Sequence, residues 1–291
     1  MASLQDIRRR ISSVKNTRQI TSAMKLVAGA KLRRATENAH AARPYQESLT
    51  KVLGRVAAAA PDAELPLLER CEEVKNVLLV VFTSDRGLCG GFNSNLLRDT
   101  ERRVRELRAE GREVSIITVG KKARDYLIKR DYPVAESHID VEPSEFEATA
   151  AKLGSKLRVA FVDDGFDQVM VVYNRFVSTM TQLPTGLELL PISVGGGDDE
   201  SAQTEPAGDY RYEPRGDAIL AALLPLYLDT VLLQAMLETQ AGEQAARMTA
   251  MDSATRNASD IIGNLTLKYN RARQAAITKE LIEIVSGAEA L

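Results

Sequence analysis

The sequence of 291 residues contains no tryptophan, only two cysteines and two histidines, and 5% aromatic residues. So few aromatic residues are typical of a helical protein rather than of a sandwich or barrel. Cys71 and Cys89 lack a metal-ligand spacing, and we expect both to be small buried residues rather than a disulfide. Neither His40 nor His138 belongs to a recognisable Ser/His/Asp arrangement. These absences argue against metal binding and against catalysis by this chain.

We expect neither an export signal nor a membrane-spanning segment. The basic, amphipathic start of the chain has no continuous apolar core, so we predict no secretory signal peptide. The largely apolar stretch 218–237 is interrupted by Pro225, Asp229 and Gln234. Because a charge at mid-span is costly in hydrocarbon, we expect a buried helix there and no transmembrane segment.

What the sequence does have is an apolar stripe at each end, repeating at alternating steps of three and four residues. The first seam consists of Leu4, Ile7, Ile11, Val14, Arg18, Thr21, Lys25, Ala28, Leu32, Ala35, Ala39, Ala42, Gln46, Leu49, Leu53 and Val56. The second seam consists of Met248, Met251, Thr255, Ala258, Ile262, Leu265, Tyr269, Ala272 and Ala276, after which the stripe shifts to Ile277, Leu281, Ile284 and Ala288. This spacing is typical of coiled coils.

The two stripes predict helices over 3–58 and 216–287, of roughly 80 and 105 Å at the helical rise. A narrow apolar stripe is stable only when a partner buries it, and the many alanines suit closely approaching backbones. We therefore predict that the two ends pack on each other. Two ordinary helices in a bundle are the alternative.

The first seam is polar between Arg18 and Lys25. A shifted apolar face there is formed by Ile20, Ala23, Met24 and Val27. We therefore predict that the seam rotates at this point.

Charge is distributed unevenly. Residues 1–34 contain nine Lys or Arg and one Asp, whereas residues 216–291 contain six basic and nine acidic residues. Since an exposed ion pair contributes only about 0–1 kcal/mol, this basic excess points to an acidic partner more than to stability. Without interleaved aromatic residues or a known module, the basic stretch does not favour nucleic acid, and a solvated face is the other alternative.

The middle of the chain alternates apolar runs with helical patterns. Strands are expected at 77–82, 114–119 and 169–173, helices at 94–110, 121–129 and 144–161, and a further strand or hairpin within 177–192. This order predicts a Rossmann-like α/β domain with a mostly parallel sheet. The predicted domains are residues 1–60 (coiled-coil helix), 72–195 (α/β domain), 196–214 (flexible linker and foot) and 215–291 (coiled-coil helix).

The loop Ser84–Asn93 follows the first strand, where α/β domains usually bind phosphates. Its sequence, SDRGLCGGFN, is neither G-x-G-x-x-G nor a Walker motif, because no Lys-Ser/Thr pair follows the glycines. We therefore predict no cofactor. An α/β nucleotide-binding enzyme with a helical dimerisation arm remains the alternative function.

Several segments resemble the gamma subunit of F-type ATP synthases, and the resemblance spans the chain. They are IRRRISSVKNTRQITSAMKLVAGAKLRRA from Ile7, SDRGLCGGFN from Ser84, EQAARMTAMDSATRNASDII from Glu243 and YNRARQAAITKELIEIVSGAEAL from Tyr269. The resemblance implies an antiparallel, left-handed coiled coil of the two terminal helices, and a non-catalytic rotor shaft that couples ion flow to ATP synthesis or hydrolysis. The closely spaced cysteine pair of chloroplast relatives is missing, so thiol regulation is not expected.

The resemblance also implies partners: three alpha and three beta subunits, an epsilon subunit and the membrane c-ring, with one copy of this chain in each complex. It implies a peripheral location on the cytoplasmic face of the bacterial plasma membrane. Residues matched to beta-subunit contact and coupling are Met24, Lys25, Arg33, Arg34, Arg247, Arg273, Gln274 and Thr278. Residues of the loop facing beta or epsilon are Arg86, Gly87, Leu88, Cys89, Gly90 and Gly91, and those of a foot near the ring are Tyr210, Tyr212 and Glu213.

Overall fold

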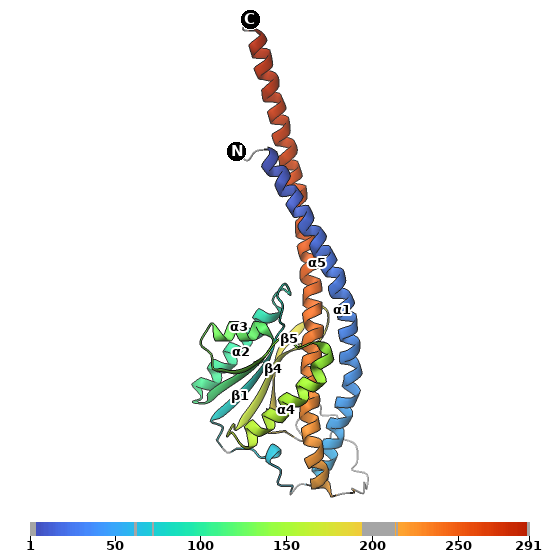
Figure 1. Cartoon of the computed structure of the whole chain (residues 1–291), viewed down its shortest axis with the longest axis vertical. Coiled ribbons are helices and arrows are strands. Elements are labelled where there is room, and N and C mark those ends of the chain that lie inside the picture. The colour runs from blue at the N-terminus through green and yellow to red at the C-terminus, as the bar shows by residue number, and fades with distance from the viewer. Residues whose placement is uncertain (1–3, 61–62, 72, 194–212, 214, 290–291) are drawn as a thin grey trace. The chain divides into compact units, whose positions relative to one another are not determined.

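The computed structural model describes residues 4–289 except 61–62, 72, 194–212 and 214 (Figure 1). Two helices dominate it: α1, Leu4–Ala59, and α5, Gly216–Glu289. Between them lie the short helices and strands η1 Pro66–Leu68, β1 Asn76–Phe82, α2 Phe92–Ala109, β2 Glu113–Val119, α3 Lys121–Ile128, β3 Val134–His138, η2 Pro143–Glu145, α4 Phe146–Val162, β4 Gln168–Phe176 and β5 Gln182–Leu190. The chain divides into two compact units, an α/β unit of residues 31–246 and a coiled-coil unit of residues 1–30 and 247–291.

The sheet of the α/β unit has the strand order β3-β2-β1-β4-β5. The first four strands are parallel, and β5 pairs antiparallel with β4. The mostly parallel Rossmann-like sheet predicted from the alternating pattern is confirmed. β3 was not predicted, because Val134–His138 is an edge strand with polar residues and no fully buried position.

Two apolar cores lie on opposite faces of this sheet. On one face, Val77, Leu79 and Val81 of β1 pack with residues of α2 and α3. On the other, Leu78 and Val80 pack with α4, α5 and α1 (Figure 1). Because successive strand residues point to opposite faces, the continuous apolar run of β1 fills both cores.

The part of α5 that belongs to the α/β unit is a core helix. Leu220, Leu224, Leu228 and Leu232 are each at most 1% exposed. In the described part of the chain, α5 is also the single helix long and apolar enough to cross a membrane by length and composition. Its apolar residues here cover the sheet, as expected of a buried helix.

In the coiled-coil unit, α1 and α5 run antiparallel. Lys25 contacts Asp252, and Thr21, one turn earlier on α1, contacts Thr255, one turn later on α5. The three-four spacing gives such a pair a left-handed supercoil, as predicted. Every position of both predicted seams is buried or half-buried, with Ala28 of α1 at 1% and Met251 of α5 at 5% exposure.

The predicted rotation of the first seam is wrong. Arg18, Thr21 and Lys25 keep their inward positions, whereas Ile20 and Val27 of the shifted face are 61% and 56% exposed. The seam stays in register because Thr21 and Lys25 find polar partners on α5.

The prediction that both cysteines are buried is confirmed for one and wrong for the other. Cys89 is buried, but Cys71 is exposed. Cys71 lies in the irregular segment before β1, where no packed element covers it.

The turn between β2 and α3 supplies a test of this fold. Gly120 has a φ of +110°, and a Cβ there would lie 2.2 Å from the carbonyl oxygen of Thr83. We expect Gly120→Ala to lower the free energy of unfolding by about 2–4 kcal/mol, through clash and backbone strain. Urea unfolding measures the change.

Gly54→Ala is the matched control. Gly54 lies within α1, where an added Cβ has nothing within 4 Å. Alanine in a helix interior is favoured over glycine, so this variant should gain about 0.5–1 kcal/mol. Equal urea midpoints for the two variants would contradict the described turn.

Candidate partner-binding surfaces

A polar layer crosses the seam of the coiled-coil unit. The Lys25 ammonium lies 2.6 Å from Oδ1 of Asp252, and Arg256 donates to Oδ2 of the same carboxylate at 2.5 Å. The hydroxyl oxygens of Thr21 and Thr255 are 2.8 Å apart. The hydrogen bond from Lys25, with the charge of Arg256, lowers the pKa of the Asp252 carboxyl. Lys25, predicted as a contact residue, is therefore bonded within the coiled coil.

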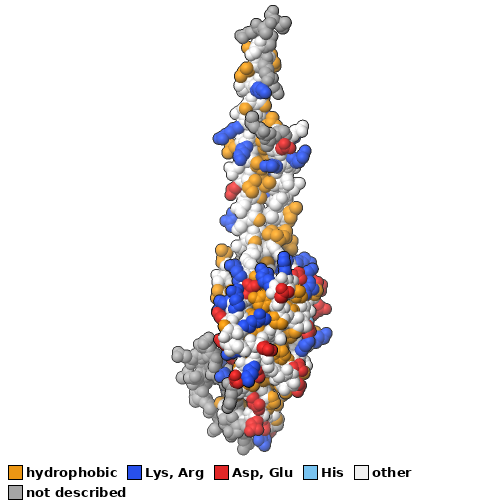
Figure 2. Space-filling view, turned by 90° about the vertical axis from the view of Figure 1, so that its left-hand side faces the viewer, with side chains coloured by type: hydrophobic (Ala, Val, Ile, Leu, Met, Phe, Trp, Pro, Cys, Tyr) orange, Lys and Arg blue, Asp and Glu red, His pale blue; other side chains and the backbone are white. Residues whose placement is uncertain are grey.

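The outer face of α1 beside this layer is apolar. Met24 is half-buried, and its neighbours one turn away on α1, Ile20 and Val27, are 61% and 56% exposed; Leu26, further round the helix, is 71% exposed. In the space-filling view, hydrophobic side chains reach the surface along the paired helices (Figure 2). An exposed group of large apolar side chains is typical of a surface that a partner covers.

Three predicted contact residues lie together near the end of α5. Arg273, Gln274 and Thr278 are all exposed, and Thr278 follows Gln274 by four residues, which puts these two on adjacent turns of the same face. Ile277 and Leu281, on the same stretch, are 49% and 58% exposed. In Figure 1 this end of α5 continues past the first turn of α1.

Arg247 differs from these three. It lies on α5 just before the second seam and is half-buried. It takes part in a further interaction within the chain. At the helical rise it lies roughly 40 Å along α5 from Arg273, so the structure does not bring the two guanidinium groups together.

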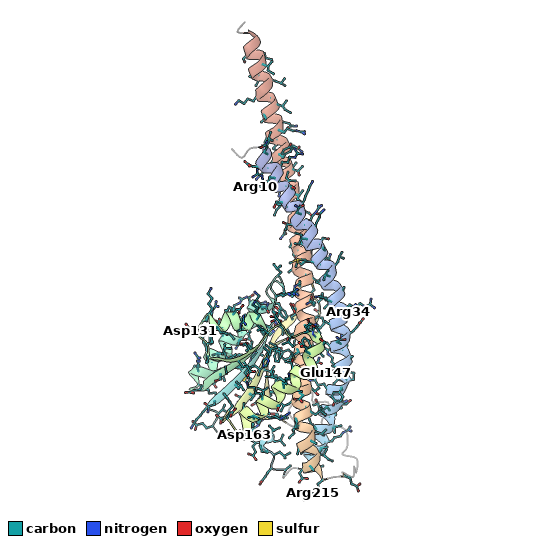
Figure 3. All side chains as sticks on the ribbon, viewed as in Figure 1. Arg10, Arg34, Asp131, Glu147, Asp163 and Arg215 are labelled. Atoms are coloured by element: carbon teal, nitrogen blue, oxygen red, sulfur yellow. The ribbon has the colours of Figure 1, made fainter. Side chains whose placement is uncertain are left out.

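Several basic side chains of α1 are exposed in both units, whereas Arg18 and Lys25 take inward positions. Arg8, Arg9 and Arg10 are exposed in the coiled-coil unit. In the α/β unit, Arg34 is exposed, and Arg33 donates to Glu37 at 3.0 Å on the helix surface. Figure 3 labels one member of each group: Arg10 in the coiled-coil unit and Arg34 in the α/β unit. The predicted basic surface is therefore present on α1.

The loop Ser84–Asn93 is tied together by its own polar side chains. The Asn93 amide donates to the Ser84 hydroxyl at 2.7 Å and approaches the Cys89 sulfur at 3.3 Å. Asp85 accepts from the Lys121 amide and Thr83 from the Ala123 amide, at 2.8 and 2.9 Å. These two bonds tie the end of β1 and the start of the loop to the first turn of α3, and the Phe92 amide, the first of α2, donates to the Cys89 carbonyl at 3.2 Å.

The same loop presents some of its residues and hides others. Arg86, Gly90 and Gly91 are exposed, Gly87 is half-buried, and Cys89 is 2% exposed. Leu88 has a φ of +62° and is 66% exposed. A non-glycine residue at positive φ is uncommon, and Leu88 combines this conformation with an exposed apolar side chain.

The predicted linker and foot, residues 196–214, fall almost wholly outside the described residues. Tyr210 and Tyr212 are among those not described, while Glu213 is described and exposed. No group of three or more His, Cys, Asp or Glu side chains able to hold a metal occurs among the described residues.

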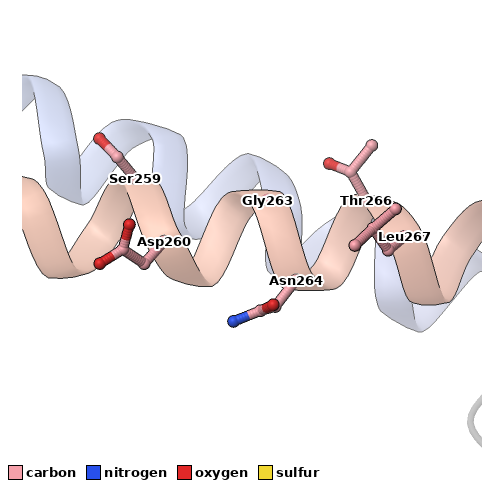
Figure 4. A pocket seen from close by; sticks show the side chains of 6 residues that line it. All are labelled: Ser259, Asp260, Gly263, Asn264, Thr266 and Leu267. Atoms are coloured by element: carbon pink, nitrogen blue, oxygen red, sulfur yellow. The ribbon is translucent and has the colours of Figure 1, made fainter.

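One shallow hollow lies on the surface of the coiled-coil unit. It is lined by Ser259, Asp260, Gly263, Asn264, Thr266 and Leu267 (Figure 4). All six belong to α5, and an added Cβ at Gly263 would have nothing within 4 Å. The hollow is therefore an open notch on one helix rather than an enclosed ligand site.

Sequence reasoning missed the partners of the polar layer. Asp252 was not singled out, although Thr255 was counted in the second seam. The pairing could have been predicted because both seams contain polar residues, Thr21 and Lys25 in the first and Thr255 in the second, and polar residues at inward positions favour partners across the seam.

The comparisons with known proteins cover the whole chain. The sequence model of the family described as ATP synthase matches residues 3–291. The ATP synthase gamma chain of Desulforamulus reducens is 48% identical over 291 residues, covering 100% of both chains, and that of Geobacter sp. is 47% identical, covering 100% of this chain and 99% of the relative. A solved structure of the Euglena gracilis mitochondrial ATP synthase (OSCP/F1/c-ring) contains a similar chain, with 21% identity, a TM-score of 0.67 and coverage of 99% of this chain and 94% of that chain.

The polar layer predicts a pH dependence. Because the folded pKa of Asp252 lies below its ordinary value of 3.8, the carboxylate stabilises the fold fully above that value. This stabilisation is lost as the pH falls through the lowered pKa. Between about pH 5 and pH 2, we expect the melting temperature of the wild type to fall more steeply than that of Asp252→Asn.

Circular dichroism of both proteins across this pH range measures the effect. Asp252→Asn is the control because its amide oxygen still accepts from Lys25 but does not titrate. Parallel curves would show that Asp252 is not bonded as described.

Proposed function

Because this chain belongs to the gamma-chain family of F-type ATP synthases, as a subunit of their central stalk, we propose that it transmits torque as the rotor shaft. Proton or sodium ion flow through a membrane ring would turn the shaft, and the shaft would drive ATP synthesis in the catalytic subunits. In the reverse direction, ATP hydrolysis would pump ions. The observation that carries this proposal is the match of the ATP synthase family over residues 3–291.

The paired helices support this role physically. A single long helix bends and untwists readily, whereas two helices that bury a shared seam resist both. The exposed apolar face around Met24 and the basic side chains of α1 give the shaft different surfaces on different sides. A shaft with unequal sides contacts each surrounding catalytic subunit differently, and so favours a different conformation in each.

The proposed partners are three alpha and three beta subunits around one copy of this chain, with an epsilon subunit and the membrane c-ring. Met24, Arg33, Arg34 and Arg247 would contact beta subunits, with acidic beta loops meeting the basic side chains. Lys25 would contribute through the part of its side chain, 44% exposed, that Asp252 leaves open. The loop from Arg86 to Gly91 would face beta or epsilon, and Tyr210, Tyr212 and Glu213 would lie near the ring.

We propose that the chain is itself non-catalytic and binds no cofactor. As part of a membrane-associated complex it would lie peripherally on the cytoplasmic face of the plasma membrane. The alternative, an α/β nucleotide-binding enzyme, finds little support in the loop Ser84–Asn93, which carries neither phosphate-binding motif and whose Ser84 and Asn93 side chains are bonded to each other.

Co-purification tests the class of function. A tagged chain expressed with alpha and beta subunits should recover one complex with three of each and a single copy of this chain, as its family membership implies. Native mass spectrometry measures the stoichiometry. Tight ATP binding by the chain alone, abolished by changing Gly90 or Gly91, would instead favour the nucleotide-binding alternative.

A second prediction concerns the end of α5. The double variant Arg273→Ala, Gln274→Ala should lower ATP turnover of the assembled complex roughly tenfold, as loss of a charge-assisted contact of about 1.4 kcal/mol would. Both side chains are exposed, so the melting temperature should not change. A large loss of thermal stability would assign these residues to folding instead. Lys268→Ala, also exposed on α5, is the control.

A further inference from the structure

A buried carboxylate on α5 joins three elements of the α/β unit. Glu238 is 6% exposed. Its Oε2 accepts a hydrogen bond from the backbone N–H of Phe176, the last residue of β4, at 3.1 Å. Its Oε1 accepts from Gln234 at 2.9 Å and lies 3.6 Å from the guanidinium of Arg43 on α1. Glu238 thus links α5 to both the sheet and α1.

The surroundings of this carboxylate are polar and tightly packed. Burial, with the negative charge of Glu238, raises the pKa of Tyr173 on β4 to about 12. One turn further along α5, an added Cβ at Gly242 would lie 2.9 Å from the ring of Phe92 and 3.3 Å from Gln182. The helix therefore approaches β5 and α2 closely just beside Glu238.

The remaining contact between α5 and the sheet is largely apolar. Side chains such as Leu228 and Leu232 are fully buried there. The hydrophobic effect is non-directional, so the register of this apolar contact rests on side-chain packing alone. A charged hydrogen bond to a strand amide is directional and fixes one register.

We propose that Glu238 is a positioning residue that locks α5 and α1 to the sheet, so that rotation of the α/β unit is passed to the helices without slip. The inference rests on the proposed function, since it concerns how torque enters the shaft. Without the carboxylate, the apolar interface would still hold α5 on the sheet but would permit more than one register.

Two substitutions of Glu238 distinguish the loss of its hydrogen bonds from a general loss of stability. Glu238→Ala removes both hydrogen bonds and leaves the Phe176 amide and the Arg43 guanidinium without the carboxylate. Glu238→Gln keeps an acceptor for Phe176. Its amide nitrogen can donate to the Gln234 side-chain oxygen, which has no partner among the described residues. The glutamine variant should therefore keep α5 in its register on the sheet.

Leu232→Ala is the matched control. Leu232 is buried on the same helix and lies against Gly154 of α4. Its truncation weakens the apolar interface through a cavity but leaves every hydrogen bond of Glu238 in place.

The experiment compares the four chains in the assembled ATP synthase. Ions pumped per ATP hydrolysed, the melting temperature, and hydrogen exchange at the Phe176 amide are measured. In Glu238→Ala, we expect exchange at Phe176 about tenfold faster and a loss of pumping per ATP, with hydrolysis retained. Glu238→Gln should pump like the wild type, and Leu232→Ala should melt earlier but pump fully.

Full pumping by Glu238→Ala, or an equal loss in Leu232→Ala, would overturn the proposed lock. A wild-type chain that fails to assemble with the catalytic subunits would instead overturn the proposed function. The two failures are therefore distinguishable in one series.

Discussion

The structure depends on one constraint: an apolar stripe too narrow to form a core must still be buried along a helix many turns long. α1 and α5 meet this constraint in two ways. In the coiled-coil unit they bury each other, and in the α/β unit they bury apolar positions against one face of the sheet. Alanine recurs in the first seam, at Ala28, Ala35 and Ala39, and lets the backbones approach closely. The outer surface of α1 is left free for charge and for exposed apolar side chains.

Polar contacts add directional bonds to the apolar packing of both units. Lys25 with Asp252 does so in the coiled-coil unit, and Glu238 with the Phe176 amide does so in the α/β unit. In each case a charged group sits at an inward position that an apolar side chain would otherwise fill. For the buried Glu238, a shift would leave a charge without its partner, which is costly. The Lys25–Asp252 pair is more exposed, so its effect on pairing is smaller.

Sequence periodicity predicted both long helices to within a few residues, because a seam repeating over many turns is a strong signal. It did not predict that Arg18, Thr21 and Lys25 stay inward, since this depends on Asp252 and Thr255 across the coiled coil. β3 was missed because an edge strand needs no apolar pattern. The positive φ of Leu88 was equally invisible, because it depends on bonds between both ends of its loop. Arg273, Gln274 and Thr278 came from family resemblance, and no physical pattern marked them.

The antiparallel pairing also has a consequence for biosynthesis. The two polar contacts of the coiled coil join residues 227 and 234 positions apart. The ribosome therefore releases the N-terminal helix long before its partner exists. The α/β domain between them can fold first, domain by domain, while the apolar stripe of the early helix waits in solvent. Its dense positive charge keeps such a nascent segment soluble and discourages self-association. The last segment to be translated is thus the one that completes the coiled coil.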